Sequence, residues 1–228
     1  MKEIGILGTG RMAIRLADMF AKAGVKVQLG SRTPQRAKNI ALALKQENIV
    51  GGTYEEALTK DWFLPAIFLR DGLLDLLEEN KVSLEGKVLL DIANPFNDTY
   101  SDFTSSWDTS ASEDIAKILP NVKIIGAFKN VWYEVFDEPF FEEGISAVYM
   151  ISEHDELKKE LAETLKETNF RYVDAGKLQN ARTIERMTLL ATELSLRYEY
   201  FPRVNWKFLG TEWTIGEKDK YAKILEEA

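Results

Sequence analysis

Near its N-terminus the chain carries a glycine pattern whose spacing suits phosphate binding. Gly8-Thr9-Gly10-Arg11-Met12-Ala13 fits G-x-G-x-x-G/A and lies between a strand-like and a helix-like segment. Gly8 would allow a tight turn, Gly10 would let the backbone approach a pyrophosphate, and Ala13 would keep the helix close to a sheet. The helix N-terminus would then offer free N–H groups to the phosphates. The pattern predicts a dinucleotide site, and a glycine turn without a ligand is the alternative.

The residues that follow the second predicted strand bear on which dinucleotide binds. An NAD site usually places an acidic side chain there, about 20 residues beyond the glycines, to hold the ribose 2′-hydroxyl. Here the segment reads Gly30-Ser31-Arg32-Thr33, and Arg36 follows one helical turn after Arg32. A guanidinium can pair with a 2′-phosphate, and the two hydroxyls can donate to it. We predict NADP(H), held by Ser31, Arg32, Thr33 and Arg36. The alternative is that these arginines are ordinary surface charges.

Most other catalytic chemistries lack their residues. The chain has no cysteine and one histidine, His154, which lies in a polar segment, so thiolate chemistry and a Ser-His-Asp triad have no good candidate. No metal-ligand spacing and no Walker pattern occur, so we expect no metal. Hydride transfer remains, in which the cofactor carries the reaction and the protein supplies placement. With a flavin-like partner no protein acid or base is needed, so we predict no catalytic acid–base residue.

Short apolar runs alternate with helix-period segments along most of the chain. The predicted strands are 2–7, 25–29, 49–50, 62–68, 87–92, 122–127, 145–151 and 171–174. The predicted helices are 11–23, 34–47 with Thr33 as N-cap, one opened by Thr53 and Glu56, 72–80, one capped by Ser110 and Glu113, 155–169 and 181–200. Loops are expected at 96–109 and 128–144. This order predicts an α/β fold of Rossmann type, a doubly wound and mostly parallel sheet.

Composition and the last part of the chain set the remaining expectations. We predict a dinucleotide-binding domain over 1–175 and a small helical, aromatic extension over 176–228 that packs on it and ends in a charged helix.

The net charge of −8 disfavours nucleic acid and anionic membranes as partners. No apolar run approaches the roughly 18 residues of a membrane span, and the N-terminus has no signal-peptide pattern. We therefore expect a cytoplasmic protein that binds neither nucleic acid nor membrane.

Several further motifs resemble one family. Asp91-Ile92-Ala93-Asn94-Pro95, Gly126-Ala127-Phe128-Lys129-Asn130 and the segment 174–185, which fits D-A-G-x-L-x-x-[AS]-R-x-x-E, join the glycine pattern and Gly30-Ser31-Arg32 in this resemblance. Over nearly the whole chain the sequence resembles the NADPH-dependent deazaflavin (coenzyme F-420) reductases, also called F-420-dependent NADP oxidoreductases. The reductase domain of the STEAP metalloreductases is similar. The segment 174–185 is the most distinctive piece, because it lies outside the general Rossmann features.

The resemblance implies roles for particular residues. The pyrophosphate would be lined by Thr9, Gly10, Arg11 and Met12. Ile67 and Phe68 would border the ribose and nicotinamide. The nicotinamide, where the hydride acceptor stacks, would be flanked by Asn94, Pro95 and Ala127, with Lys129 nearby. The resemblance also implies a homodimer, and a flavin or deazaflavin as a small-molecule co-substrate.

Two departures leave the acceptor open. The fourth strand of the family usually ends in a V-P or I-P pair, whereas here Pro65 comes earlier and Phe68 stands where proline is expected. Lys129 occupies a position that can hold His or Asn. Aromatic side chains in the two predicted loops could form a stacking surface for a flat ring, or they could be core and interface packing: Phe96, Tyr100, Phe103, Trp107, Trp132, Tyr133 and Phe136.

Three functions stay open on the sequence. The first is an NADP-dependent oxidoreductase that transfers a hydride between NADPH and a flavin-like or deazaflavin acceptor. The second is an NADP(H)-binding sensor without turnover, because a Rossmann fold does not fix a function. The third is a reductase of a small imine or carbonyl, similar to pyrroline-carboxylate reductases in its N-terminal domain.

Overall fold

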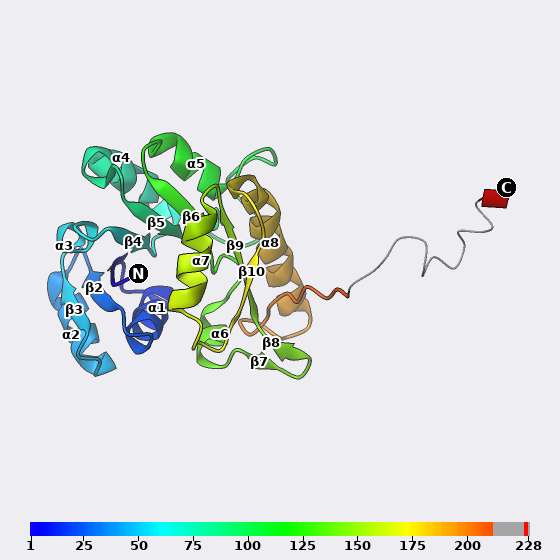
Figure 1. Cartoon of the computed structure of the whole chain (residues 1–228), viewed down its shortest axis with the longest axis horizontal. Helices are drawn as coiled ribbons and strands as arrows, with labels where there is room; N and C mark the ends of the chain where they lie inside the picture. Colours follow the sequence, from blue (N-terminus) through cyan, green and yellow to red (C-terminus); the bar gives the residue numbers. More distant parts are fainter. Residues whose placement is uncertain (212–225, 228) are drawn as a thin grey trace.

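The computed structural model describes residues 1–211 and 226–227 of the chain. An eight-stranded sheet runs through its centre in the order β10-β9-β6-β5-β4-β1-β2-β3 (Figure 1). The strands are β1 (Glu3–Leu7), β2 (Lys26–Gly30), β3 (Ile49–Gly52), β4 (Trp62–Pro65), β5 (Val88–Asp91), β6 (Lys123–Gly126), β9 (Ala147–Ser152) and β10 (Arg171–Asp174). The first six are parallel to one another, while β9 runs antiparallel to β6. The predicted doubly wound, mostly parallel sheet is confirmed.

Helices cover both faces of this sheet (Figure 1). One apolar core joins the sheet to α1 (Arg11–Lys22), α2 (Pro34–Leu44) and α7 (Asp155–Thr164), and another joins it to α3 (Tyr54–Leu58), α4 (Leu73–Leu84) and α5 (Ala111–Ile118). Side chains of one strand contribute alternately to the two cores, because successive side chains of a strand point to opposite faces. The long helix α8 (Ala181–Arg197) packs on β9 through Ala181 and Ile184.

Local sequence signals explain where several helices begin. The buried side chains of α1 recur every three or four residues, which gives the helix an apolar face toward the sheet. Thr53 and Glu56 form the predicted capping box, with the Glu56 N–H donating to Thr53 Oγ1 at 3.2 Å and the Thr53 N–H donating to Glu56 Oε2 at 2.8 Å. Ser110 Oγ accepts from the Glu113 N–H at 3.2 Å, which caps α5.

The structure differs from the sequence prediction in several segments. Strand β4 ends at Pro65 rather than at residue 68, because beyond it the chain leaves the sheet around the Gly8 turn and enters the short 3-10 helix η1 (Leu69–Asp71). The predicted loop 128–144 contains α6 (Tyr133–Asp137), β7 (Phe140–Phe141) and the first residue of β8 (Gly144–Ile145). Helix α4 continues to Leu84, and α7 already ends at Thr164. The Thr33 side chain makes no capping hydrogen bond to α2.

The C-terminal extension is described in part. Helix α8 and the short 3-10 helix η2 (Leu178–Asn180) confirm a helical C-terminal part, and the split at residue 175 stays a prediction. Trp213 and most of the predicted charged helix lie outside the described residues. Within the part of the chain that the structure describes, none of the helices combines the length and the apolar character that a membrane crossing needs.

Candidate active site

The main pocket lies where the strand order reverses. Strands β2 and β3 extend the sheet on one side of β1, and β4 extends it on the other, so the ends of β1 and β4 flank a crevice in which α/β proteins bind ligands. A cavity of about 530 Å³ opens there. Its lining is mostly apolar and aromatic and includes Gly10, Arg11, Met12, Ala13, Ala66, Ile67, Phe68, Ile92, Ala93, Asn94, Phe96, Tyr100, Phe128, Lys129, Val131, Trp132, Tyr133, Thr188 and Phe201.

At one end of the cavity the glycine turn and the start of α1 have the properties of a phosphate cradle. Gly8 has φ +116°, and a Cβ there would lie 2.8 Å from the Ala66 carbonyl oxygen, so the turn needs glycine. Gly10 is the N-cap of α1 and has φ −84°, and a Cβ there would meet nothing within 4 Å. Protein packing therefore leaves room beside Gly10. No acidic residue occupies the first turn of α1, so a phosphate would meet free N–H groups without repulsion.

The predicted 2′-phosphate residues cluster at the end of β2. Ser31 is buried, and its Oγ accepts from the Thr33 N–H at 3.1 Å, which shapes the turn. Arg36 Nε donates to Thr9 Oγ1 at 2.9 Å, and Nη2 donates to the Thr9 carbonyl at 3.3 Å, so this guanidinium joins the turn after β2 to the glycine loop. Arg32 is exposed, and its positive charge opposes the rise that burial causes in the pKa of the Tyr54 phenol.

At the other end of the cavity, aromatic rings form a wall. Phe96 contacts Tyr100 and Trp132 at centroid distances of 5.4 and 5.8 Å, and Trp132 contacts Phe201 edge to face at 5.0 Å. Arg70 holds the loop that carries two of these rings, because Nη1 donates to the Phe96 carbonyl at 2.8 Å and Nη2 donates to the Tyr100 hydroxyl at 3.0 Å. The sequence left open whether the aromatic rings of the two loops form a stacking surface or core packing. Some of these rings line the cavity.

Helix α6 joins the wall to the phosphate end. Arg11 Nη1 donates to the Tyr133 hydroxyl at 2.7 Å, and the Arg11 guanidinium lies 4.7 Å from the centre of the Tyr133 ring. One turn further along α1, Arg15 pairs with Asp137 through a hydrogen bond of 2.7 Å from Nε. These contacts hold the aromatic segment after β6 against the first two turns of α1. The position of the aromatic wall is therefore tied to that of the phosphate end.

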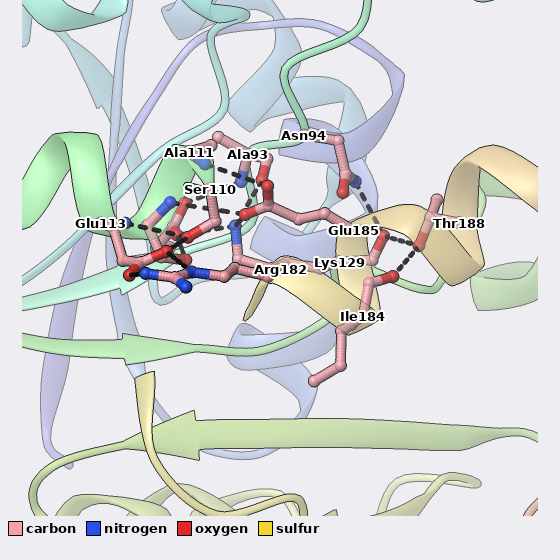
Figure 2. A network of polar contacts seen from close by, with 12 residues as sticks. Ala93, Asn94, Ser110, Ala111, Glu113, Lys129, Arg182, Ile184, Glu185 and Thr188 are labelled. Carbon is pink, nitrogen blue, oxygen red and sulfur yellow. Dashed lines mark hydrogen bonds and ion pairs between the residues drawn. The ribbon is translucent and has the colours of Figure 1, made fainter. Parts of the chain in front are cut away.

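Beneath the cavity lies a group of buried charges, which we call the ion network: Asp91, Lys129 and Glu185. Figure 2 shows Lys129 and Glu185 of this network. Lys129 Nζ lies 2.7 Å from Asp91 Oδ2 and 2.9 Å from Glu185 Oε1, and it also donates to the Ala93 carbonyl. These three acceptors take up the three donors of the ammonium. The network joins the end of β5, the turn after β6 and α8.

Both carboxylates of the network also accept hydrogen bonds from uncharged donors. Glu185 Oε2 accepts from the Ala111 N–H at 3.0 Å, in the first turn of α5, and Asp91 Oδ2 accepts from Ser112 Oγ at 2.5 Å. Burial disfavours the Lys129 ammonium, but the two carboxylates outweigh it, so the pKa of Lys129 is raised. Burial also raises the pKa of Glu185, and Lys129 opposes that rise. Lys129 is therefore a charged anchor.

The predicted nicotinamide residues divide into two groups in the structure. Asn94 and Lys129 line the cavity, as do Ile67 and Phe68, whereas the lining includes neither Pro95 nor the fully buried Ala127. Two buried polar atoms of lining residues, Asn94 Oδ1 and Trp132 Nε1, have no hydrogen-bond partner among the described residues. An unpaired buried polar atom is costly, so these atoms fit a cavity that receives a polar ligand.

Sequence reasoning missed Arg70 as a supporting residue of this site, and it noted Asp91 only as the first residue of the segment 91–95. Glu185 was noted only as part of the segment 174–185, and its contact with Lys129 now gives that segment a physical role. The nearby Arg182 pairs with Glu113 on α5 through Nε at 2.8 Å. The described residues hold no group of acidic, histidine or cysteine side chains that could bind a metal ion.

Comparison with known proteins shows which families this chain is similar to. Residues 3–95 match the family model described as NADP oxidoreductase, coenzyme F420-dependent. The F420-dependent NADP reductase of Methanothermobacter marburgensis is 28% identical over 211 residues, which cover 86% of this chain and 93% of that protein. The chain is a relative of the F420-dependent NADP reductases.

Two other comparisons give a further relative and a solved structure with the same fold. Human metalloreductase STEAP2 is 26% identical over 189 residues, covering 82% of this chain and 36% of that protein. A crystal structure from Arthrobacter sp. FB24, described as a candidate F420-dependent NADP reductase, has the same fold with a TM-score of 0.79 at 20% identity, covering 93% of this chain and all of that one. The predicted resemblance is confirmed, and the comparisons support an NADP-dependent oxidoreductase with NADP(H) as its cofactor.

Proposed function

We propose that this protein transfers a hydride between NADPH and a flavin-like or deazaflavin acceptor. The observation that carries the proposal is one cavity with two unlike ends. Gly10 and the N-terminus of α1 form the phosphate end, and the rings of Phe96, Trp132 and Phe201 form the far end. A nicotinamide that extends from the phosphates would reach the middle of this cavity, and a flat acceptor ring would stack against the aromatic wall.

The residues present fit NADP(H). The cradle at Gly10 has space that a Cβ would fill, and the end of β2 carries Arg32 and Arg36 with no acidic side chain between them. The 2′-phosphate would pair with these guanidinium groups. When bound, the nicotinamide supplies the hydride chemistry, and the chain's own residues place the two rings and exclude water.

The ion network supports a reaction without a protein acid at this position. Among the described residues that line the cavity, Lys129 alone carries an amine. Its ammonium donors are taken up by Asp91, Glu185 and the Ala93 carbonyl, and its pKa is raised, so it holds its proton. Reduction of a flavin-like ring also takes up one proton, which solvent can supply at a ring nitrogen, whereas reduction of a ketone or an imine usually needs a positioned protein acid, and Lys129 does not supply one.

The first experiment measures the loss of NADPH absorbance with purified protein and a panel of acceptors. The panel contains FMN, FAD, a deazaflavin, a ferric chelate, a quinone and a cyclic imine. We expect rapid oxidation with a ring-type acceptor. Turnover with the cyclic imine alone would favour an imine reductase, and NADPH binding without any turnover would favour a sensor.

Arg32→Glu tests the cofactor part of the proposal. The substitution replaces a charge-assisted pair by repulsion, so we expect NADPH binding to weaken by roughly 10- to 100-fold, the equivalent of about 1.5–3 kcal/mol, with NADH binding little changed. Lys38→Glu, an exposed position on the same helix as Arg36, makes the same charge change and is the control. Equal losses for NADPH and NADH in Arg32→Glu would show that Arg32 has a structural role.

We also propose that the protein is a homodimer. Several large apolar side chains at the end of α8 and beyond it are exposed, as expected of a contact surface: Leu196, Tyr198, Tyr200, Phe208 and Leu209. Light scattering on the purified chain measures the mass directly, and a monomer at all concentrations would contradict this part of the proposal.

A further inference from the structure

The orientation of the Asn94 side chain is fixed by its neighbours. Its Nδ2 donates to the Lys129 carbonyl at 2.8 Å (Figure 2). A carbonyl oxygen can only accept, so the amide nitrogen must face Lys129 and Oδ1 must point elsewhere. Oδ1 is buried and has no partner among the described residues, although Asn94 lines the cavity. The site therefore holds one acceptor of known orientation that lacks a donor.

The Lys129 carbonyl that holds Asn94 is itself fixed from α8. Thr188 Oγ1 lies 3.0 Å from this carbonyl and 3.0 Å from the Ile184 carbonyl, and its hydroxyl donates toward both (Figure 2). Thr188 is buried and also lines the cavity. Phe128, just before Lys129, has φ +58°, a conformation that is costly for an aromatic residue and persists only where its surroundings impose it. The turn after β6 is thus held in one shape.

The ion network holds the same turn from below. Lys129 is tied through its side chain to Asp91 and Glu185, and the Asp91 Oδ1 atom accepts from the Ala93 N–H at 2.8 Å. Both peptide segments that determine where Asn94 points, its own and that of Lys129, are therefore anchored to buried charges. A buried network of this kind is rigid when all of its members are paired.

We propose that Asn94 Oδ1 accepts a hydrogen bond from an amide N–H of the bound ring system. Thr188 is then a positioning residue, which holds the Asn94 side chain in the orientation that this hydrogen bond needs. This inference rests on the proposed function and deepens it. Two ring systems of the proposed reaction carry such a donor: the carboxamide of the nicotinamide, and the imide N–H of a flavin or deazaflavin. Either donor would satisfy Oδ1, the buried acceptor that the protein leaves unpaired.

The experiment compares ligands that carry this donor with analogues that lack it. Isothermal titration calorimetry measures the affinity for NADP against its 3-acetylpyridine analogue, which has a methyl ketone in place of the carboxamide. A second arm measures the affinity for 8-hydroxy-5-deazariboflavin against its N3-methyl derivative. In the wild type we expect the N–H ligand of one pair to bind roughly five- to tenfold more tightly, the size of one uncharged hydrogen bond.

The variants assign this preference to Asn94. In Asn94→Leu, which keeps the branched shape of the side chain but removes both the acceptor and the Nδ2 donor, the preference falls to about onefold, whereas Asn121→Leu at an exposed asparagine leaves it unchanged. Thr188→Val removes the hydroxyl and reduces the preference in part, and Thr188→Ser restores it. Circular dichroism and thermal melting confirm that each variant is folded, so a general loss of structure is told apart from a loss of positioning.

Each outcome decides one point. Loss of preference in the cofactor arm assigns Asn94 to the nicotinamide carboxamide, and loss in the acceptor arm assigns it to the ring imide. An unchanged preference in folded Asn94→Leu in both arms overturns the inference while NADP binding and turnover still stand. If the wild type neither binds NADP nor oxidises NADPH with any acceptor, the proposed function itself has failed.

Discussion

The two ends of the cavity are built in different ways. The phosphate end is local: the glycine turn, the start of α1 and the end of β2 all lie within residues 8–36, and few buried charges are involved. The aromatic far end rests on β5, the turn after β6, α5 and α8, which the ion network joins beneath the cavity. The phosphate end leaves groups free for a ligand, whereas the far end pairs its charges internally.

The two ends are therefore expected to differ in how much they contribute to ligand affinity and to folding stability. Free N–H groups and exposed guanidinium groups gain most when a ligand arrives, so changes there should alter affinity more than stability. Fully paired buried charges contribute little to net stability but are costly to break, so changes there should alter folding first. Substitutions at the two ends are therefore expected to separate affinity from stability.

The largest effect is expected for Lys129→Met. The substitution leaves Asp91 and Glu185 buried without their counter-charge, and breaking a buried pair in this way costs about 3–5 kcal/mol. Urea unfolding followed by circular dichroism measures the change in the free energy of unfolding. The control is Lys177→Met, because the Lys177 side chain is 79% exposed and lies 3.7 Å from Glu153. A loss below about 1 kcal/mol in Lys129→Met would mean that the carboxylates take up a proton and that the network is not held by charge.

At the phosphate end, Gly10→Ala is expected to lower affinity while stability stays within about 0.5 kcal/mol. The backbone at Gly10 suits alanine and the new Cβ meets no protein atom, but it enters the space into which the phosphates would fit. NADP binding should weaken by at least about tenfold, since one hydrogen bond to a charged group is worth about 1.5–3 kcal/mol. Calorimetric titration and thermal melting measure the two quantities on the same sample.

Gly8→Ala is the matched comparison variant for Gly10→Ala. Its φ of +116° and the Ala66 carbonyl at 2.8 Å make the variant strained, so its melting temperature should fall. If Gly10→Ala also lost stability and kept its affinity for NADP, the cradle would be a structural turn only.

The same difference explains how far the sequence could predict the molecule. Gly8, Gly10, Arg32 and the first βαβ unit were predictable, because turn, helix start and strand end are written in neighbouring residues. The ion network was not, because Lys129 and Glu185 lie 56 residues apart and no local pattern shows that they meet. Lys129 was expected near the acceptor, and the structure shows why it lines the cavity while its ammonium is engaged elsewhere.

Helix α6 shows a second limit of the sequence. The segment 128–144 has the aromatic and polar residues of a loop, and only contacts with α1 fold part of it into a helix: Arg11 with Tyr133, and Arg15 with Asp137. A five-residue helix is too short to be stable alone, so its sequence carries almost no helical signal. Tertiary contacts decide its structure, and the strand end at Pro65 is another case in which the surroundings outweigh local propensity.

The smallest effect is expected at the edge of the far end, where Glu113 and Arg182 join α5 to α8. The hydrogen bond from Arg182 holds the pKa of Glu113 below its usual value of 4.5. The stability that this pair contributes is therefore complete above pH 4.5 and is lost as the pH falls through the lowered pKa. The pair is partly exposed, so the contribution is at most about 1 kcal/mol.

Glu113→Gln should accordingly be less stable than the wild type at pH 7, and the difference should shrink as the pH is lowered from 4.5 toward 3. Thermal melting at a series of pH values measures this convergence. Arg182→Gln should give the same curve, and the double variant should lose little more than either single one, because both substitutions remove the same contact. Parallel melting curves across the whole pH range would show that α8 is held to the sheet by the ion network and its apolar contacts without help from this pair.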